Sequence, residues 1–237
     1  MIIQAGSFSR LDVFESCKYR AKLAFVDKEK EPPRAKLPEG GEYPDERGSR
    51  IHDECEQFVL GEGEFTEGMR HFKPEFNKLR QECKDGKVVV ENMWCYKDDW
   101  TYFSPHVFWD PDIRFRIKTD ATVFTSDTSA LIIDYKTGKR YNNEVKHGEQ
   151  LELYVAGAFL TYDQLEKATA ELWYLDQNEL VDLSLSRKEA FKILRKWKDR
   201  NETMLNATEF PPNPNVYTCK WCPFGPAKGG QCTVGVQ

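Results

Sequence analysis

The order of apolar patterns along the chain is the feature that most constrains its fold. Segments typical of strands occur at residues 87–97, 112–124, 129–138, 168–177 and 180–186. Helical patterns occur at residues 7–25, 47–61, 74–83, 147–162 and 187–205. Because one helix separates the third strand from the fourth, the order predicts an α/β fold with a central mixed sheet flanked by helices.

The chain of 237 residues is long enough to bury a core of its own. We therefore expect a single domain over residues 1–237, with an N-terminal helix in 1–26 and the main core in 46–206. A polar loop rich in Pro and Gly covers residues 27–46, and a Cys-rich tail covers 207–237. We expect the tail to be pinned to the N-terminal helix.

Charge and cysteine content limit the classes of function. The net charge is −5, which argues against a wholly electrostatic nucleic-acid binder but not against a metal-dependent nuclease, whose carboxylates bind cations. No apolar run approaches the ~20 residues of a membrane span, and no secretory signal is visible, so we expect no membrane partner and a cytoplasmic location. The chain has seven cysteines, an odd number, which argues against a disulfide framework.

Two carboxylates and a lysine fall on neighbouring predicted strands. Asp120 lies within one strand, Asp134 ends the next, and Lys136 follows two residues later on the same face. If the strands form a hairpin, Asp120 approaches Asp134, and the two carboxylates with a backbone carbonyl suit Mg²⁺ or Mn²⁺. The Lys136 ammonium would then orient water or neutralise charge on a phosphate. The alternative is a plain ion pair at a strand edge, although a carboxylate ending an apolar strand is costly unless it is paired or metal-bound.

Five short motifs together resemble the RecB-like branch of the PD-(D/E)xK nuclease superfamily. In chain order they are SRLDVFESC in the first helix, GSRIH, KTDATVF, LIIDYKTGK and QLELY. The resemblance implies a restriction-endonuclease-like core and a Mg²⁺- or Mn²⁺-dependent hydrolase. Lys118 stands where relatives commonly have glycine, which suggests a narrower cleft or an additional phosphate contact.

The resemblance also implies roles by position. Asp120, Asp134 and Lys136 would be catalytic, and the metal ligands would be His52, Asp120, Asp134 and the carbonyl of Tyr135. Residues that organise the site or contact DNA would be Gln150, Tyr154, Glu91 and Lys118. A lone histidine such as His52 is more often a surface or core residue than a ligand, and Glu91 is equally consistent with an ordinary strand glutamate.

The tail contains Cys219-x2-Cys222 followed by Cys232, which supplies three soft ligands. Iron–sulfur members of the nuclease branch, among them CRISPR adaptation nucleases, the AddB subunit and phage exonucleases, add one cysteine from the first helix. Cys17 holds that place here, so the resemblance implies a 4Fe–4S cluster on four cysteines. A structural zinc, or no metal, is the alternative, and the other three cysteines are expected to be packing thiols.

Four functions compete at this point. The leading one is a DNA exonuclease that acts on single strands or free ends, in phage or host recombination or repair, in a bacterial or phage-infected cell. The others are a CRISPR spacer-processing nuclease, a non-catalytic DNA-binding recombination accessory, and a zinc-stabilised nucleic-acid-binding module. A recombination or CRISPR partner protein, and a homo-oligomer, are further expectations of the nuclease readings.

Overall fold

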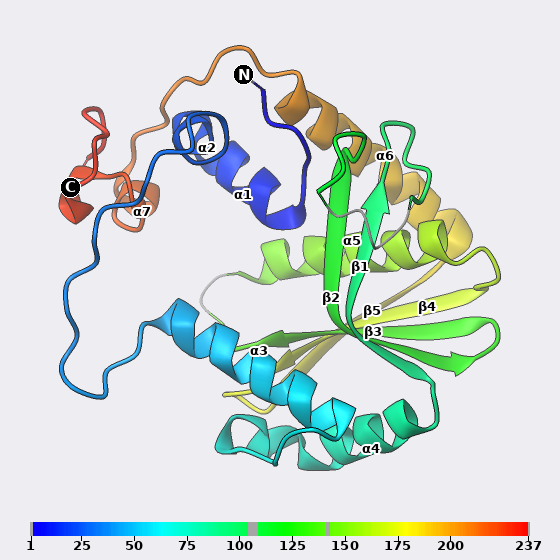
Figure 1. Cartoon of the computed structure of the whole chain (residues 1–237). Helices are drawn as coiled ribbons and strands as arrows, with labels where there is room; N and C mark the ends of the chain where they lie inside the picture. The colour runs from blue at the N-terminus through cyan, green and yellow to red at the C-terminus, as the bar shows by residue number, and fades with distance from the viewer. Residues whose placement is uncertain (1, 104–108, 141–142, 237) are drawn as a thin grey trace.

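The computed structural model of the chain describes residues 2–103, 109–140 and 143–236. A five-stranded sheet lies between two layers of helices (Figure 1). The strands are β1 (Val88–Tyr96), β2 (Phe115–Ser126), β3 (Ser129–Lys136), β4 (Lys167–Tyr174) and β5 (Glu179–Ser186). The predicted α/β class, with a mixed sheet flanked by helices, is confirmed.

The strands lie side by side in chain order, from β1 to β5. Every neighbouring pair is antiparallel except β3 and β4, which run parallel and are joined by α5 (Glu144–Thr161). A parallel pair needs such a crossover, because its two strands start at the same edge of the sheet. The carboxyl ends of β3 and β4 therefore meet at one edge, where Lys136 is paired with Tyr174.

Each face of the sheet is buried under its own helices. One core includes side chains of α1 (Phe8–Ser16), α5 and α6 (Arg187–Leu205), and the other includes those of α3 (Pro44–Leu60) and α4 (Lys73–Lys84). The shorter helices are α2 (Lys18–Ala21), η1 (Lys22–Val26), η2 (Glu67–Phe72), α7 (Val216–Cys219) and η4 (Pro226–Lys228). Figure 1 shows α3 and α4 below the sheet and α5 and α6 above it.

The first helix differs from its prediction, because it is interrupted at Cys17. Ser7 caps α1, with its hydroxyl accepting from the backbone N–H of Arg10, but Cys17 has extended backbone and separates α1 from α2. The carbonyl of Ser16, exposed by this break, accepts a hydrogen bond of 3.1 Å from Asn213 of the tail. A helix end with a partner for its free carbonyl can stop there at little cost, and the break brings Cys17 and the tail together.

Candidate active site and cysteine pocket

The hairpin of β2 and β3 brings the two predicted aspartates into one corner. The strands are antiparallel and Ala121 is paired with Ile133, so Asp120 lies beside the segment that contains Asp134. Oδ2 of Asp120 accepts a hydrogen bond of 2.5 Å from the backbone N–H of Tyr135, the residue between Asp134 and Lys136. The hairpin on which the approach of the two aspartates depended is therefore present, and Asp120 holds the backbone of the DYKTG segment.

Asp134 is buried, and its two oxygens have different surroundings. Oδ1 accepts hydrogen bonds from Nε2 of Gln150, at 3.2 Å, and from the hydroxyl of Tyr154, both on α5. Oδ2 forms an ion pair with Nζ of Lys136, at 2.6 Å. Apart from this ion pair, Oδ2 is a buried oxygen without a hydrogen-bond partner among the residues that the structure describes.

His52 reaches the same corner from helix α3. Its Nδ1 lies 3.0 Å from Oδ1 of Asp120. Burial lowers the pKa of His52, but the hydrogen bond to Asp120 and the charges of Asp120 and Asp134 outweigh it, so the pKa lies above its ordinary value. Burial also raises the pKa of Asp120; the bond to His52 opposes this effect, and the charge of Asp134 adds to it. Two carboxylates held so close together would both be more stable as anions beside a cation.

Glu91 and Lys118 lie on the neighbouring strands β1 and β2. Their side chains form an ion pair with each other across the two strands. Glu91 has a φ of 49°, a left-handed conformation that is uncommon for a residue other than glycine. The register of β1 and β2 places Glu91 opposite Asp120, between the pairs Val90–Ala121 and Asn92–Thr119. The two residues therefore lie next to the corner, and their predicted roles in the site stay predictions.

The donors in the corner suit a divalent cation, although they contact one another here. Among the described residues, no three His, Cys, Asp or Glu side chains gather closely enough to hold a metal ion as they stand. The oxygen of Asp134 that lacks a hydrogen bond, the second buried carboxylate and the neighbouring imidazole are nevertheless the ligand types of Mg²⁺ and Mn²⁺ sites. These residues fit the cation.

The four cysteines of the predicted cluster line one pocket. Cys17, Cys219, Cys222 and Cys232 all border a space of about 450 Å³, part of it open to solvent, between the α1–α2 break and the tail. All four are free thiols, and burial raises the pKa of Cys222. Of the other three cysteines, Cys55 and Cys95 are buried in the cores, and Cys83 is packed against the core under α3 and α4. The pocket is thus bordered by thiols from both ends of the described chain, although no three of them gather closely enough to hold a metal ion as they stand.

The family comparison identifies the superfamily to which this fold belongs. Residues 5–227 match the family described as the PD-(D/E)XK nuclease superfamily. The chain belongs to this superfamily. The match includes the β2–β3 corner, α5 and most of the cysteine tail, so the restriction-endonuclease-like core predicted from the sequence is the fold of this superfamily member. No curated protein matches the chain.

Three solved structures were matched to the nuclease, and one of them reaches a TM-score that indicates a shared fold. A putative exonuclease from Eubacterium rectale has a TM-score of 0.50 at 10% identity, and the match covers 92% of this chain and 87% of that one. SSO0001 gives 0.46 at 13% identity, covering 99% and 88%, and an alkaline exonuclease from Laribacter hongkongensis gives 0.33 at 12% identity, covering 86% and 87%. None of the described helices is both long enough and apolar enough to span a membrane.

Two residues near the corner escaped the sequence analysis of this nuclease. Nδ1 of His147 lies 2.5 Å from the hydroxyl of Tyr174, and burial and the charge of Lys136 lower the pKa of His147 to about 4. His147 precedes Gln150 by three residues on α5, and that spacing on a helix was a signal that it faces the same corner. Asp176 lies in the turn after β4, and nothing in its local sequence indicates that it contacts another element.

Proposed function

We propose that this nuclease is a metal-dependent deoxyribonuclease that removes nucleotides from DNA ends, with single strands as its preferred substrate. The observation that carries the proposal is the state of Asp134: Oδ1 is fixed by Gln150 and Tyr154, and Oδ2 is buried beside Lys136 without a hydrogen bond. An ordinary ion pair at a strand edge would need neither the burial nor the two donors from α5. The resemblance to exonucleases and the net charge of −5, which disfavours tight binding of internal duplex, support the preference for ends.

Asp120, Asp134, His52 and the carbonyl of Tyr135 would hold Mg²⁺ or Mn²⁺. When bound, the cation would supply Lewis-acid polarisation of the scissile phosphate and would favour deprotonation of a nearby water. Gln150 and Tyr154 keep the plane of the Asp134 carboxylate fixed, so that Oδ2 stays directed at the site. Both side chains are buried beneath the carboxylate, which supports an organising role for them.

Besides the bound cation, the corner would use a positive charge from the protein itself, the ammonium of Lys136. Its ammonium lies at the corner, with its side chain 23% exposed, where it can donate a hydrogen bond to a non-bridging phosphate oxygen as negative charge develops there. Water adds to phosphorus, the bond from phosphorus to the leaving nucleotide breaks, and the leaving oxygen takes up a proton. Asp120 accepts a hydrogen bond from the backbone N–H of Tyr135 and so holds the backbone next to Lys136 in place.

End-labelled linear DNA and covalently closed duplex circles, each incubated with Mn²⁺, test the activity. We expect stepwise shortening of linear DNA, faster for single strands, and little cutting of the circles. The Asp134→Asn variant is the matched control, since it keeps the shape of the side chain and loses the charge. Rapid nicking of closed circles contradicts an end-dependent nuclease, and no digestion of any DNA favours the non-catalytic accessory.

For the cysteine pocket we infer a 4Fe–4S cluster held by Cys17, Cys219, Cys222 and Cys232, with a structural role. Four thiolates on one zinc lie about 3.8 Å apart, given Zn–S bonds of about 2.3 Å in a tetrahedron. A cluster of four irons and four sulfides spreads its four thiolates more widely, and the resemblance to iron–sulfur members of the nuclease branch favours it over zinc. Iron and sulfide analysis of anaerobically purified protein tests the inference, and one zinc without iron contradicts it.

A further inference from the structure

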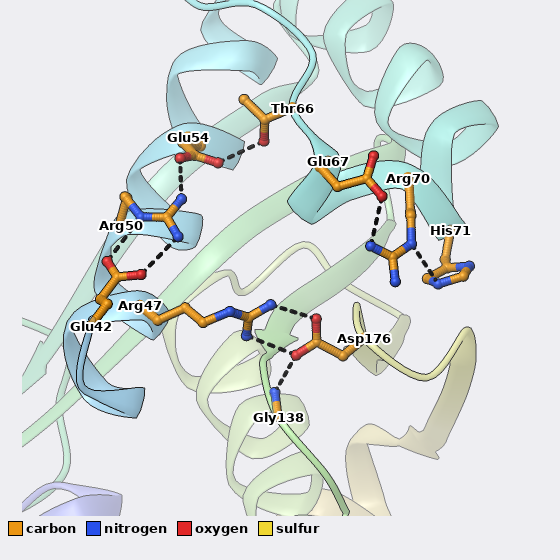
Figure 2. Close-up of polar contacts among 10 residues, drawn as sticks. All are labelled: Glu42, Arg47, Arg50, Glu54, Thr66, Glu67, Arg70, His71, Gly138 and Asp176. Atoms are coloured by element: carbon orange, nitrogen blue, oxygen red, sulfur yellow. Dashed lines mark hydrogen bonds and ion pairs between the residues drawn. The ribbon is translucent and has the colours of Figure 1, made fainter. Parts of the chain in front are cut away.

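A single carboxylate ties three elements together next to the candidate active site. Asp176, in the turn after β4, accepts hydrogen bonds from both terminal nitrogens of Arg47 on α3, at 2.9 and 2.7 Å. Its Oδ2 also accepts from the backbone N–H of Gly138, just beyond β3, at 2.6 Å. Figure 2 shows the guanidinium of Arg47 and the N–H of Gly138 converging on this side chain. A two-point arginine–carboxylate pair fixes orientation as well as distance.

The sheet explains why Asp176 lies there. The strands β3 and β4 are parallel and in register, and the backbone N–H of Leu175 continues their ladder to the carbonyl of Lys136, at 2.9 Å. The next residue, Asp176, therefore stands beside the chain that leaves β3. Helix α3 passes close to the same point, since a Cβ on Gly48 would lie only 3.2 Å from the hydroxyl oxygen of Thr137.

Two of the three tied elements carry predicted parts of the active site. His52 follows Arg47 by five residues on the rigid helix α3, and Lys136 precedes Gly138 by two residues. His52 also contacts the sheet corner directly, through its hydrogen bond to Asp120 and a ring contact with Tyr135. A shift of α3 along the end of β3 would move His52 relative to Asp134 and Lys136, and the contacts of Asp176 oppose that shift.

We propose that Asp176, with Arg47, is a positioning residue that sets the place of His52 relative to Asp134 and Lys136 and thereby the affinity of the site for its divalent cation. The inference rests on the proposed function, because it assumes that these residues bind the cation. Asp176 does not touch the reacting atoms. It acts through the helix and through the end of the strand.

The same helix provides a matched control pair. Arg50 lies three residues after Arg47 and also forms a two-point pair with a carboxylate, that of Glu42, at 2.9 Å for each bond, and it contacts Glu54 at 2.5 Å (Figure 2). These partners belong to α3 and to the loop before it, so the Arg50 pair makes no link to the end of β3. Loss of the Arg50 pair tests whether any disturbance of α3 weakens the site.

The experiment measures Mn²⁺ affinity by calorimetry for wild type, Asp176→Asn and Arg47→Lys. The first variant keeps an acceptor for the N–H of Gly138 but cannot accept both arginine bonds, and the second keeps the positive charge but not the planar fork. We expect Mn²⁺ binding about 10-fold weaker in each variant, the size typical of lost supporting contacts around metal sites. The KM for DNA should stay unchanged, and saturating Mn²⁺ should restore most of kcat. Arg50→Lys and Glu42→Gln should bind Mn²⁺ as wild type does.

The outcomes separate this inference from the proposed function. If wild type binds Mn²⁺ and Asp134→Asn does not, the cation site stands, and wild-type affinity in both Asp176→Asn and Arg47→Lys overturns the positioning role. Equal weakening by Arg50→Lys also overturns it, because a general loosening of α3 would then explain the effect. If wild type itself binds no Mn²⁺, both the site and the positioning role fall. Circular dichroism checks that each variant is folded. If Asp176→Asn does not fold, Arg47→Lys alone tests the positioning role.

Discussion

The candidate active-site corner and the cysteine pocket are organised by opposite means. The corner stands on the hairpin of β2 and β3, and Asp134 within it is only 6% exposed and contacts three side chains. The cysteine pocket is formed by segments from the two ends of the chain. Of the described tail residues 207–236, only Phe224 and Gly225 are buried. One site is built into the core, whereas the other lies where little core exists.

The difference separates two sources of order. In the corner, the sheet and α5 hold the carboxylates in place, so the protein bears the cost of bringing like charges together before any cation arrives. In the tail, few buried contacts offset the conformational entropy of ordering it. We therefore expect loss of a corner residue to affect activity far more than stability, and loss of a pocket cysteine to do the reverse.

The largest effect is expected for Asp134→Asn. Removal of the charge takes away a cation ligand and the partner of Lys136, so the rate of DNA hydrolysis should fall by at least ~10²–10³-fold. The melting temperature should stay the same or rise, because one of two neighbouring buried carboxylates has been neutralised. Rates on end-labelled single strands, measured beside the thermal melt, check both parts.

Lys136→Met sharpens this prediction. It removes the ammonium and keeps most of the side-chain volume, so we expect a similar loss of rate with Mn²⁺ binding retained. A variant at Asp134 that digests DNA at the wild-type rate contradicts the assignment of the corner as the active site.

The opposite result is expected for Cys232→Ser. A cluster that joins Cys17 to the tail closes a long loop, as a covalent cross-link does, so its loss should lower the melting temperature by roughly 5–10 °C. Iron content should fall with it, whereas the rate per folded molecule should stay near that of wild type. Cys83→Ser, outside the pocket, is the control and should keep both the iron and the melting temperature.

Much of the fold was predictable because its signals are local. The strand patterns of β2 and β3 follow each other closely in the chain, and α6 begins at Arg187 behind the capping box of Ser186 and Glu189. The break at Cys17 was not predictable in this way. Its backbone is extended, and its neighbouring carbonyl is satisfied by Asn213, a residue 197 positions from Ser16.

The candidate site shows the same limit. Asp120, Asp134 and Lys136 became candidates through strand order and strand periodicity, and Gln150 and Tyr154 only through the resemblance to the nuclease family. The pairing of Arg47 with Asp176 joins residues 129 positions apart, and no pattern in either segment specifies it. The left-handed backbone of Glu91 likewise has no glycine or turn signal in its strand.

The smallest effect concerns the pH dependence of the contact between α3 and the end of β3. The hydrogen bonds from Arg47 hold the pKa of Asp176 below its ordinary value; burial opposes this effect, and the N–H of Gly138 adds to it. A carboxyl whose pKa is lowered on folding stabilises the protein above its unfolded-state pKa, and this contribution is lost as the pH falls through the lowered value. The melting temperature of Asp176→Asn should therefore lie below that of wild type at pH 7, and the difference should shrink as the pH falls below the ordinary aspartate range. When Arg47 is already replaced in an Arg47→Gln background, Asp176→Asn should lower the melting temperature at pH 7 by less than it does in wild type. A gap that stays constant from pH 7 to the acid limit would show that the charge of Asp176 contributes nothing to holding the helix against the strand.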